Sequence, residues 1–404
     1  MKQPSKSPSA QAIPIALLAI ALLLLAINMR APIVMLGSVA PILKDALGLN
    51  DDMIGWLGAL PMPAFALGSL LSPFIARRFG LETTLVAMVG LIILSLIVRV
   101  LDGASLFFVG TAMMAIAIGF VNTLGAPIIK KHAPNHIALM TGLLSLCMSV
   151  FAGVIAWAVL PITHAVGWRL GMGLWAVVGM ATLIIWLIIA RRSSTGSTSS
   201  FTPAGTITTQ DRMPFNAWRD INAWALAAFM GIQSMLFYGL AAFLPMIGVA
   251  KGLTLEDATS LALTFQLAAP FTIIGLTWLI KRGVPVRMAA MVAAILNTVG
   301  VAGLIYLPNH LHLWSLAMGL GAASIFTLSL MMFSLRTYDS DTARDVSGMV
   351  QAVGYSIAFF GPVMLGRLFE YYQDWQMPLT ALLSLMVVNV GIAWFATRPY
   401  MFGK

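Results

Sequence analysis

Residues 191–220 read RRSSTGSTSSFTPAGTITTQDRMPFNAWRD and form the only long polar stretch of the chain. Serine, threonine and glycine dominate its first part, and a segment of this composition cannot bury a core, so we expect a flexible linker. Apolar runs lie on both sides of it. The sequence therefore predicts two units, residues 1–190 and 221–404, joined by a linker at 191–220.

Each unit contains six apolar runs, and each run is long enough to cross a bilayer core of roughly 30 Å. We therefore predict an all-α polytopic membrane protein, with twelve transmembrane helices in two pseudo-symmetric six-helix halves. The predicted helices are 13–39, 53–75, 83–101, 105–127, 137–161, 169–190, 221–247, 258–280, 285–306, 312–333, 346–367 and 377–397.

The composition indicates the same class, because 60% of the residues are hydrophobic and 9% are charged. Soluble domains carry about 25% charged residues, and a water-soluble chain this apolar would expose large apolar patches. The net charge of +9 would suggest nucleic acid for a soluble protein. Here the basic residues lie in short loops and form no patch with interleaved aromatic residues, so we expect a lipid bilayer and no nucleic acid as partner.

The distribution of basic residues predicts the orientation. Most of the 23 lysines and arginines fall on the side of the N-terminus, in the loops that follow even-numbered helices. Such residues collect in cytoplasmic loops, so we expect both termini in the cytoplasm of a bacterium, with the chain in its inner (plasma) membrane. The basic residues assigned at or near the outer side are Lys44, Arg99, Arg169, Lys251 and Arg367.

The two units also repeat each other in sequence. The segment HIALMTGLLSLCMSVFAG at 136–153 resembles RDVSGMVQAVGYSIAFFG at 344–361, since both have a basic start followed by small residues. Trp168 and Trp375 follow these segments at equivalent places. Parallel six-helix repeats occur in transporters, where the substrate site lies near the bilayer midplane between the repeats. We expect a central site of this kind.

Five motifs spread over most of the chain resemble those of a known family. They are Asn28-Met29-Arg30, Ala76-Arg77-Arg78-Phe79-Gly80, Lys130-Lys131-His132-Ala133-Pro134 with Leu139-Met140-Thr141-Gly142, Gly167-Trp168-Arg169, and Gly231-Ile232-Gln233-Ser234-Met235-Leu236-Phe237-Tyr238-Gly239. In them the chain resembles the major facilitator superfamily and, within it, the cyanate and 2-nitroimidazole porters. The resemblance implies a secondary active or facilitative transporter that works by alternating access, with cyanate transport or nitroimidazole transport as the expected activities.

The chain departs from the superfamily pattern in the loop after its second helix. Arg77, Arg78 and Gly80 are present, but the acid of the usual G-x-x-x-D-R-x-G pattern is missing, which leaves the usual charge relay at the inner gate without its acid. Helix-breaking residues indicate where helices bend during transport, although plain packing is the alternative. The predicted gating residues are Arg77, Arg78, Pro61, Pro63, Gly361 and Pro362.

Arg30 is the strongest candidate for substrate binding because it lies inside the first apolar run. An arginine at the centre of a membrane helix costs at least about 2.5–3.5 kcal/mol and normally marks a functional site. None of the 14 acidic residues lies deep in an apolar run, so no buried counter-ion is expected. The planar guanidinium suits carboxylate, cyanate or nitro oxygens. We predict an anion-binding role; pairing with backbone carbonyls or a helix amide is the alternative.

Neutral polar residues within the apolar runs form a second group of candidates. Gln233 and Tyr238 lie on the expected repeat mate of the first helix, and Gln351 and Tyr355 share one helix face. For each residue, hydrogen bonding between helices is the alternative to substrate contact. Besides Arg30, the predicted substrate-binding residues are Asn28, Asn122, Gln233, Tyr238, Gln266, Gln351 and Tyr355, and Asn297 belongs to the same class.

Other functional classes find little support in the sequence. The single cysteine, Cys147, cannot form a disulfide within the chain, and no His–carboxylate pair has metal spacing on one helix face, so we expect no metal and no cofactor. An intramembrane enzyme would need clustered acid, base or nucleophile residues, so an enzyme is not expected. A multidrug-type efflux transporter of apolar or cationic compounds remains the alternative on this fold, and we expect the chain to work as a monomer.

Overall fold

The computed structural model describes residues 13–101, 103–195 and 215–403. Within these ranges the regular structure is helical apart from one isolated β-bridge between Thr337 and Phe402. Twelve spans are long and apolar enough to cross a membrane, which confirms the all-α twelve-span prediction. The predicted flexible segment lies mostly outside the described residues, and so does the N-terminal tail.

Before the linker the helices are α1 (Ile15–Leu47), α2 (Asp51–Ala59), α3 (Pro61–Phe79), α4 (Leu81–Val100), α5 (Ala104–His132), α6 (Ile137–Val166), α7 (Trp168–Gly173) and α8 (Trp175–Thr195). After the linker they are α9 (Ile221–Ala250), α10 (Leu255–Lys281), α11 (Val286–Tyr306), α12 (Leu311–Leu335), α13 (Ser340–Tyr372) and α14 (Gln376–Ala396). Short 3₁₀ turns lie at Pro134–His136, Ala217–Arg219 and Pro308–His310.

Two predicted spans are each built from two helices. The second span breaks between Ala59 and Pro61, because proline fits the first position of a helix, where no N–H is needed, better than its interior. The sixth span breaks between α7 and α8. The first helix is also longer than predicted: α1 continues to Leu47 and ends at Gly48, whose φ of 64° is left-handed.

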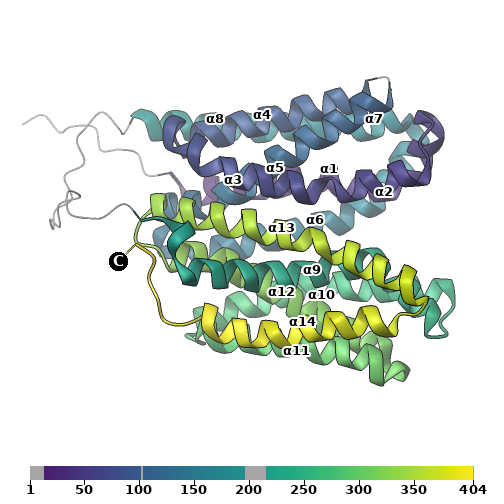
Figure 1. Cartoon of the computed structure of the whole chain (residues 1–404). Coiled ribbons are helices and arrows are strands. Elements are labelled where there is room, and N and C mark those ends of the chain that lie inside the picture. The colour runs from purple at the N-terminus through teal and green to yellow at the C-terminus, as the bar shows by residue number, and fades with distance from the viewer. Residues whose placement is uncertain (1–12, 102, 196–214, 404) are drawn as a thin grey trace, which may run out of the picture.

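The helices before the linker pack chiefly against one another, and the helices after it do the same. Figure 1 shows most of the first group, coloured purple to blue-green, above the second group, coloured teal to yellow. We call these groups the first half and the second half. They meet where α3, α5 and α6 face α13, α12 and α10. At the left of Figure 1, α1 begins, α8 ends, α9 begins and α14 ends; we call this the linker end and the opposite end the far end.

The internal repeat is visible in the packing of glycines. Gly119 of α5 lies against the backbone of Phe65 of α3, and Gly319 of α12 lies against the backbone of Phe265 of α10. A Cβ atom at either glycine would overlap the carbonyl oxygen of the phenylalanine. Both halves therefore use the same small-residue contact to bring equivalent helices close together.

Candidate substrate site between the two halves

Arg30 lies near the middle of α1 and reaches the interface between the halves. Its Cζ atom lies 6.0 Å from the ring centroid of Phe326, near the middle of α12. The guanidinium also interacts electrostatically with the hydroxyl groups of Tyr238 on α9 and Tyr355 on α13. One charged group of the first half thus faces three aromatic residues of the second half.

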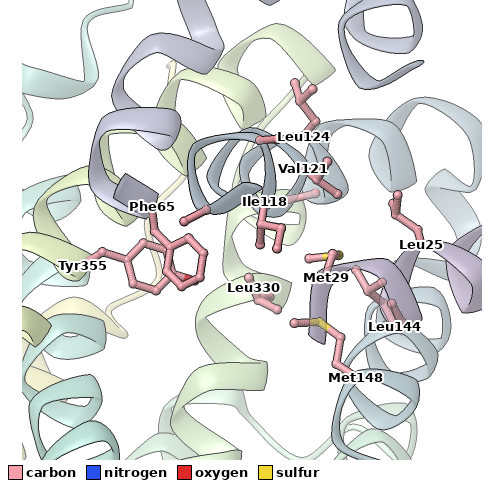
Figure 2. Packing of buried hydrophobic residues seen from close by; sticks show 14 of the residues in the cluster. Leu25, Met29, Phe65, Ile118, Val121, Leu124, Leu144, Met148, Leu330 and Tyr355 are labelled. Atoms are coloured by element: carbon pink, nitrogen blue, oxygen red, sulfur yellow. The ribbon is translucent and has the colours of Figure 1, made fainter. Parts of the chain in front are cut away.

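Other aromatic rings pack against the rings of both tyrosines. Phe65 of α3 packs against Tyr355 with ring centroids 5.4 Å apart, as Figure 2 shows. Phe237 stands perpendicular to Tyr238 at 5.1 Å and packs against Phe265 at 5.7 Å. The site therefore combines one guanidinium and two phenol hydroxyls with apolar ring surface, which suits a small planar solute that has an electron-rich end.

Arg30 has no carboxylate partner among the residues that the structure describes. The ion pairs described there join residues at the helix ends, such as Arg77 with Asp345 and Lys131 with Glu82. Arg30 is half-buried and lies close to the ring of Phe326 and to the hydroxyl groups of Tyr238 and Tyr355 in the opposite half. A positive charge in this setting is left available for an anion.

The interface on the linker side of Arg30 is filled by apolar side chains. Figure 2 shows Met29, Leu144, Met148 and Leu330 packed together there. A cavity beside them, lined also by Asn122, is large enough for about one water molecule. This apolar packing lies between Arg30 and the linker end in this conformation.

Two of the predicted substrate-binding residues lie in this closed region. The Nε2 atom of Gln351 on α13 donates to the Asn122 carbonyl oxygen at 3.3 Å and to Ser347 Oγ at 2.9 Å. Ser347 Oγ in turn donates to the carbonyl oxygen of Thr123 at 2.8 Å. The hydrogen bond from Gln351 to the backbone of Asn122 thus joins the two halves on the linker-end side of Arg30.

Further bonds between the halves lie closer to the linker end. Lys130 Nζ of α5 donates to the carbonyl oxygens of Ser334 at 2.8 Å and Thr337 at 2.6 Å, just where α12 ends. Ser334 Oγ donates back to the carbonyl oxygen of Ala126 at 2.9 Å. A cation is favourable at the C-terminus of a helix because the last carbonyl groups carry partial negative charge. We define the linker-end seal as the cross-half hydrogen bonds donated by Gln351, Ser347, Lys130 and Ser334, together with the Arg77–Asp345 ion pair.

The predicted gating residues occupy several settings. Arg77 forms its ion pair with Asp345 of α13, so the opposite half supplies the acid that the loop motif lacks. Arg78 stacks on Phe79, with Cζ 5.4 Å from the ring centroid. Pro61 and Pro63 lie at the beginning of α3, where Pro61 is buried and Pro63 is exposed. Gly361 and Pro362 lie within α13, and Gly361 packs against the backbone of Met235.

The hydrogen bonds and exposure of three further predicted substrate-binding residues differ from those of the Arg30 cluster. Asn28 Nδ2 donates to Leu24 O at 2.9 Å and to Thr182 Oγ1 of α8 at 2.7 Å, so its amide is used within the first half. Gln233 is buried and accepts a hydrogen bond from Ser234 Oγ at 3.3 Å. Gln266 is exposed on α10. Of the predicted set, the structure brings together Arg30, Tyr238 and Tyr355.

Arg99, expected at or near the outer side, lies in the last turn of α4, and its side chain is completely buried in the first half. Its Nη1 atom donates to the carbonyl oxygen of Pro32 at 2.9 Å, and its Cζ lies 4.7 Å from the ring centroid of Phe107. The sequence contained one signal for this burial, since position 99 lies within the predicted third apolar run.

Asp345 and Phe326 were also missed. Asp345 lies in the first turns of a helix, where acids are common, and Phe326 is one of 21 phenylalanines. Their partners Arg77 and Arg30 belong to the other half of the chain, so no local pattern indicates either contact. In the part of the chain that the structure describes, no group of three His, Cys, Asp or Glu side chains is placed to hold a metal ion.

Comparisons with known proteins point to one family. Residues 16–362 match the family described as "Major Facilitator Superfamily". The 2-nitroimidazole transporter of Escherichia coli is 31% identical over 92% of this chain and 93% of its own length. The cyanate transport protein CynX of Escherichia coli is 26% identical over 92% of this chain and 96% of its own. The crystal structure of the transporter FucP in the outward conformation superposes with a TM-score of 0.73 at 15% identity, covering 96% of this chain and all of FucP.

Proposed function

Because the chain belongs to the Major Facilitator Superfamily and is therefore a membrane transporter, not an enzyme, we propose that it carries a small anionic or polar organic solute. The proposed solutes are cyanate-like anions, nitro-heterocycles and carboxylates. The observation that carries the proposal is Arg30, a guanidinium at membrane depth that faces Tyr238 and Tyr355 and has no carboxylate partner in the described part of the chain.

The arrangement recognises charge and shape together. A guanidinium forms two parallel hydrogen bonds to carboxylate or nitro oxygens, and the two tyrosine hydroxyls can donate to the same end of the solute. The rings of Phe65 and Phe326 offer apolar faces to the rest of it. The relatives that transport 2-nitroimidazole and cyanate support solutes of this size and polarity.

Alternating access follows from the position of the site between the halves. A solute at Arg30 contacts α1 of one half and α9, α12 and α13 of the other, so it stabilises conformations in which both halves approach it. The linker-end seal holds the present conformation closed on that side, and transport requires these bonds to break as the halves rock. We propose that the linker end is cytoplasmic, because its loops carry most of the basic residues.

The alternative, efflux of cationic compounds, is less compatible with this site. A cation would meet the like charge of Arg30, and no carboxylate of the described residues lies beside it to offset the repulsion. Like-charge contact in a weakly solvated site is costly. The site therefore favours solutes with an anionic or electron-rich group.

Transport into liposomes that contain the purified full chain tests the proposal. Labelled cyanate, 2-nitroimidazole and benzoate are compared with a cationic dye, for the wild type and for Arg30→Gln. We expect at least one of the first three to be carried by the wild type and none by Arg30→Gln, which should remain folded and inserted. Transport of the dye alone, or equal transport by both proteins, would overturn the proposal.

A further inference from the structure

Arg99 of α4 is fully buried, and the mechanism proposed above gives it no role. Its Nε and Nη2 atoms have no hydrogen-bond partner, and no ion pair that the described residues form includes it. An uncompensated buried charge costs several kcal/mol in proteins. A side chain this costly is retained only where its position serves a purpose.

Its surroundings hold the guanidinium in one place. The Nη1 atom donates to Pro32 O at 2.9 Å and lies 3.2 Å from Met114 Sδ, and the group lies over the ring of Phe107. Gly110 of α5 leaves room for the stem, because a Cβ there would lie 2.6 Å from Arg99 Cγ. Among the residues that the structure describes, the one hydrogen bond of Arg99 to an oxygen atom therefore goes to the backbone of α1.

That bond falls at a weak point of α1. Pro32 has no N–H, so the carbonyl group of Asn28 loses its helical partner and the turn from 28 to 32 is prone to bend. Arg30 lies in the middle of this turn. Before Arg30 in the sequence, Asn28 forms a hydrogen bond with Thr182 of α8. After Arg30, the carbonyl group of Pro32 accepts a hydrogen bond from Arg99 of α4.

We propose that Arg99 is a positioning residue for the substrate site: by holding the Pro32 carbonyl group, it fixes the direction in which Arg30 projects toward Tyr238 and Tyr355. The Asn28–Thr182 hydrogen bond fixes the other end of the same turn. This inference rests on the proposed function of Arg30 as the group that binds the anionic solute. It also assigns Asn28 a supporting role instead of substrate contact.

The charge of Arg99 contributes as well. Two guanidiniums without carboxylate partners in the first half create a positive potential that solvent screens poorly at this depth. Loss of Arg99 should therefore weaken binding of an anion more than binding of a neutral molecule of the same shape. Benzoate and benzamide form such a pair, and their affinity ratio is a property that a purely structural role of Arg99 would leave unchanged.

The test measures dissociation constants and melting temperatures of the purified full chain with cyanate, 2-nitroimidazole, benzoate and benzamide. For Arg99→Met we expect a ligand-free melting temperature at or above that of the wild type, because a buried unpaired charge is removed. Its affinity for anions should fall roughly tenfold, because small misplacements of a binding group are costly. Arg99→Lys, which can still donate to Pro32 O, should lie between the two.

Arg169→Met is the matched control, because Arg169 also stacks on an aromatic ring, Trp168, but lies on an exposed surface. If Arg99→Met does not fold, Thr182→Val tests the Asn28–Thr182 hydrogen bond instead. Its control is Thr163→Val, because the Thr163 hydroxyl donates to Val159 O within its own helix. A roughly threefold loss of affinity is expected for Thr182→Val and not for the control.

The outcomes separate the two proposals. If the wild type binds an anion through Arg30 while Arg99→Met keeps the wild-type affinity and benzoate-to-benzamide ratio, the positioning role is overturned and the proposed function stands. If Arg99→Lys is as weak as Arg99→Met, the bond to Pro32 O is not what positions Arg30, and the inference fails. If no anion or nitro compound binds the wild type, both proposals fall.

Discussion

The two halves share a scaffold but contribute different chemistry to the interface. Phe65 with Gly119 and Phe265 with Gly319 make equivalent contacts in the two halves. At membrane depth the first half nevertheless supplies a guanidinium group, that of Arg30, with Arg99 buried inside the same half, whereas the second half supplies the hydroxyl groups of Tyr238 and Tyr355. A solute between them is held by charge on one side and by hydroxyls and rings on the other, so neither half can form the site alone.

Removing the charge of the first half should have the largest effect. For Arg30→Gln we expect binding of benzoate or cyanate to weaken about 100-fold or more, because two charge-assisted hydrogen bonds of about 1.5–3 kcal/mol each are lost. Calorimetry on the purified protein measures the change. Arg169→Gln at the far end is the control, and an equal loss there would show that total charge, and not this position, determines affinity.

Removing hydroxyl groups of the second half should have a smaller effect. For Tyr238→Phe and Tyr355→Phe we expect a loss of about three- to tenfold each, since one hydrogen bond of about 0.5–1.5 kcal/mol disappears while the ring stays. The same calorimetric assay applies. Tyr371→Phe is the matched control, because Tyr371 is 80% exposed. If both site variants bind as the control does, the second half contributes only shape.

Weakening the linker-end seal should change conformation more than affinity. Lys130→Met removes two hydrogen bonds to the end of α12, and Asp345→Asn removes the partner of Arg77. We expect each to shift the equilibrium between conformations by about 1 kcal/mol toward opening at the linker end.

Thiol labelling at a cysteine introduced at Thr141, with Cys147→Ala, measures the opening, because Thr141 lines the small cavity between the halves and its hydroxyl bonds none of the described residues. Arg398→Gln is the control at the same end, because Arg398 stacks on Phe395 and forms no hydrogen bond or ion pair with the described residues of the first half. Labelling rates equal to those of the control would mean that the seal is held by apolar packing alone.

Replacing a buried amide side chain of the second half should have the smallest effect on binding. Both amide atoms of Asn389 lack a partner, and the side chain is 1% exposed. Asn389→Leu should therefore leave solute affinity unchanged and leave the melting temperature equal or slightly higher, because an unsatisfied buried amide costs about 1–3 kcal/mol. A large loss of affinity in this variant would place part of the solute site within the second half.

The structure also explains which sequence-based inferences were sound. The missing acid of the loop after the second helix was expected to leave the inner gate without its charge relay, yet Asp345 supplies a carboxylate to Arg77 from the other half. The polar residues of the apolar runs could be selected as a class, but a sequence cannot assign each one to a solute or to a neighbouring helix. Asn28 illustrates this, because its amide donates to Leu24 O of its own helix and to Thr182 Oγ1 of α8.

The sequence by itself determined the twelve spans, the repeat of two halves and the exceptional position of Arg30. Lipid requires long apolar runs and penalises every charge within them, so these features are local and can be read residue by residue. Tertiary structure decided that Arg30 meets Tyr238, Tyr355 and Phe326, that Asp345 completes the pair with Arg77, and that Arg99 is buried. These contacts depend on the rotation and crossing of helices that are distant in sequence, and hydropathy does not encode that geometry.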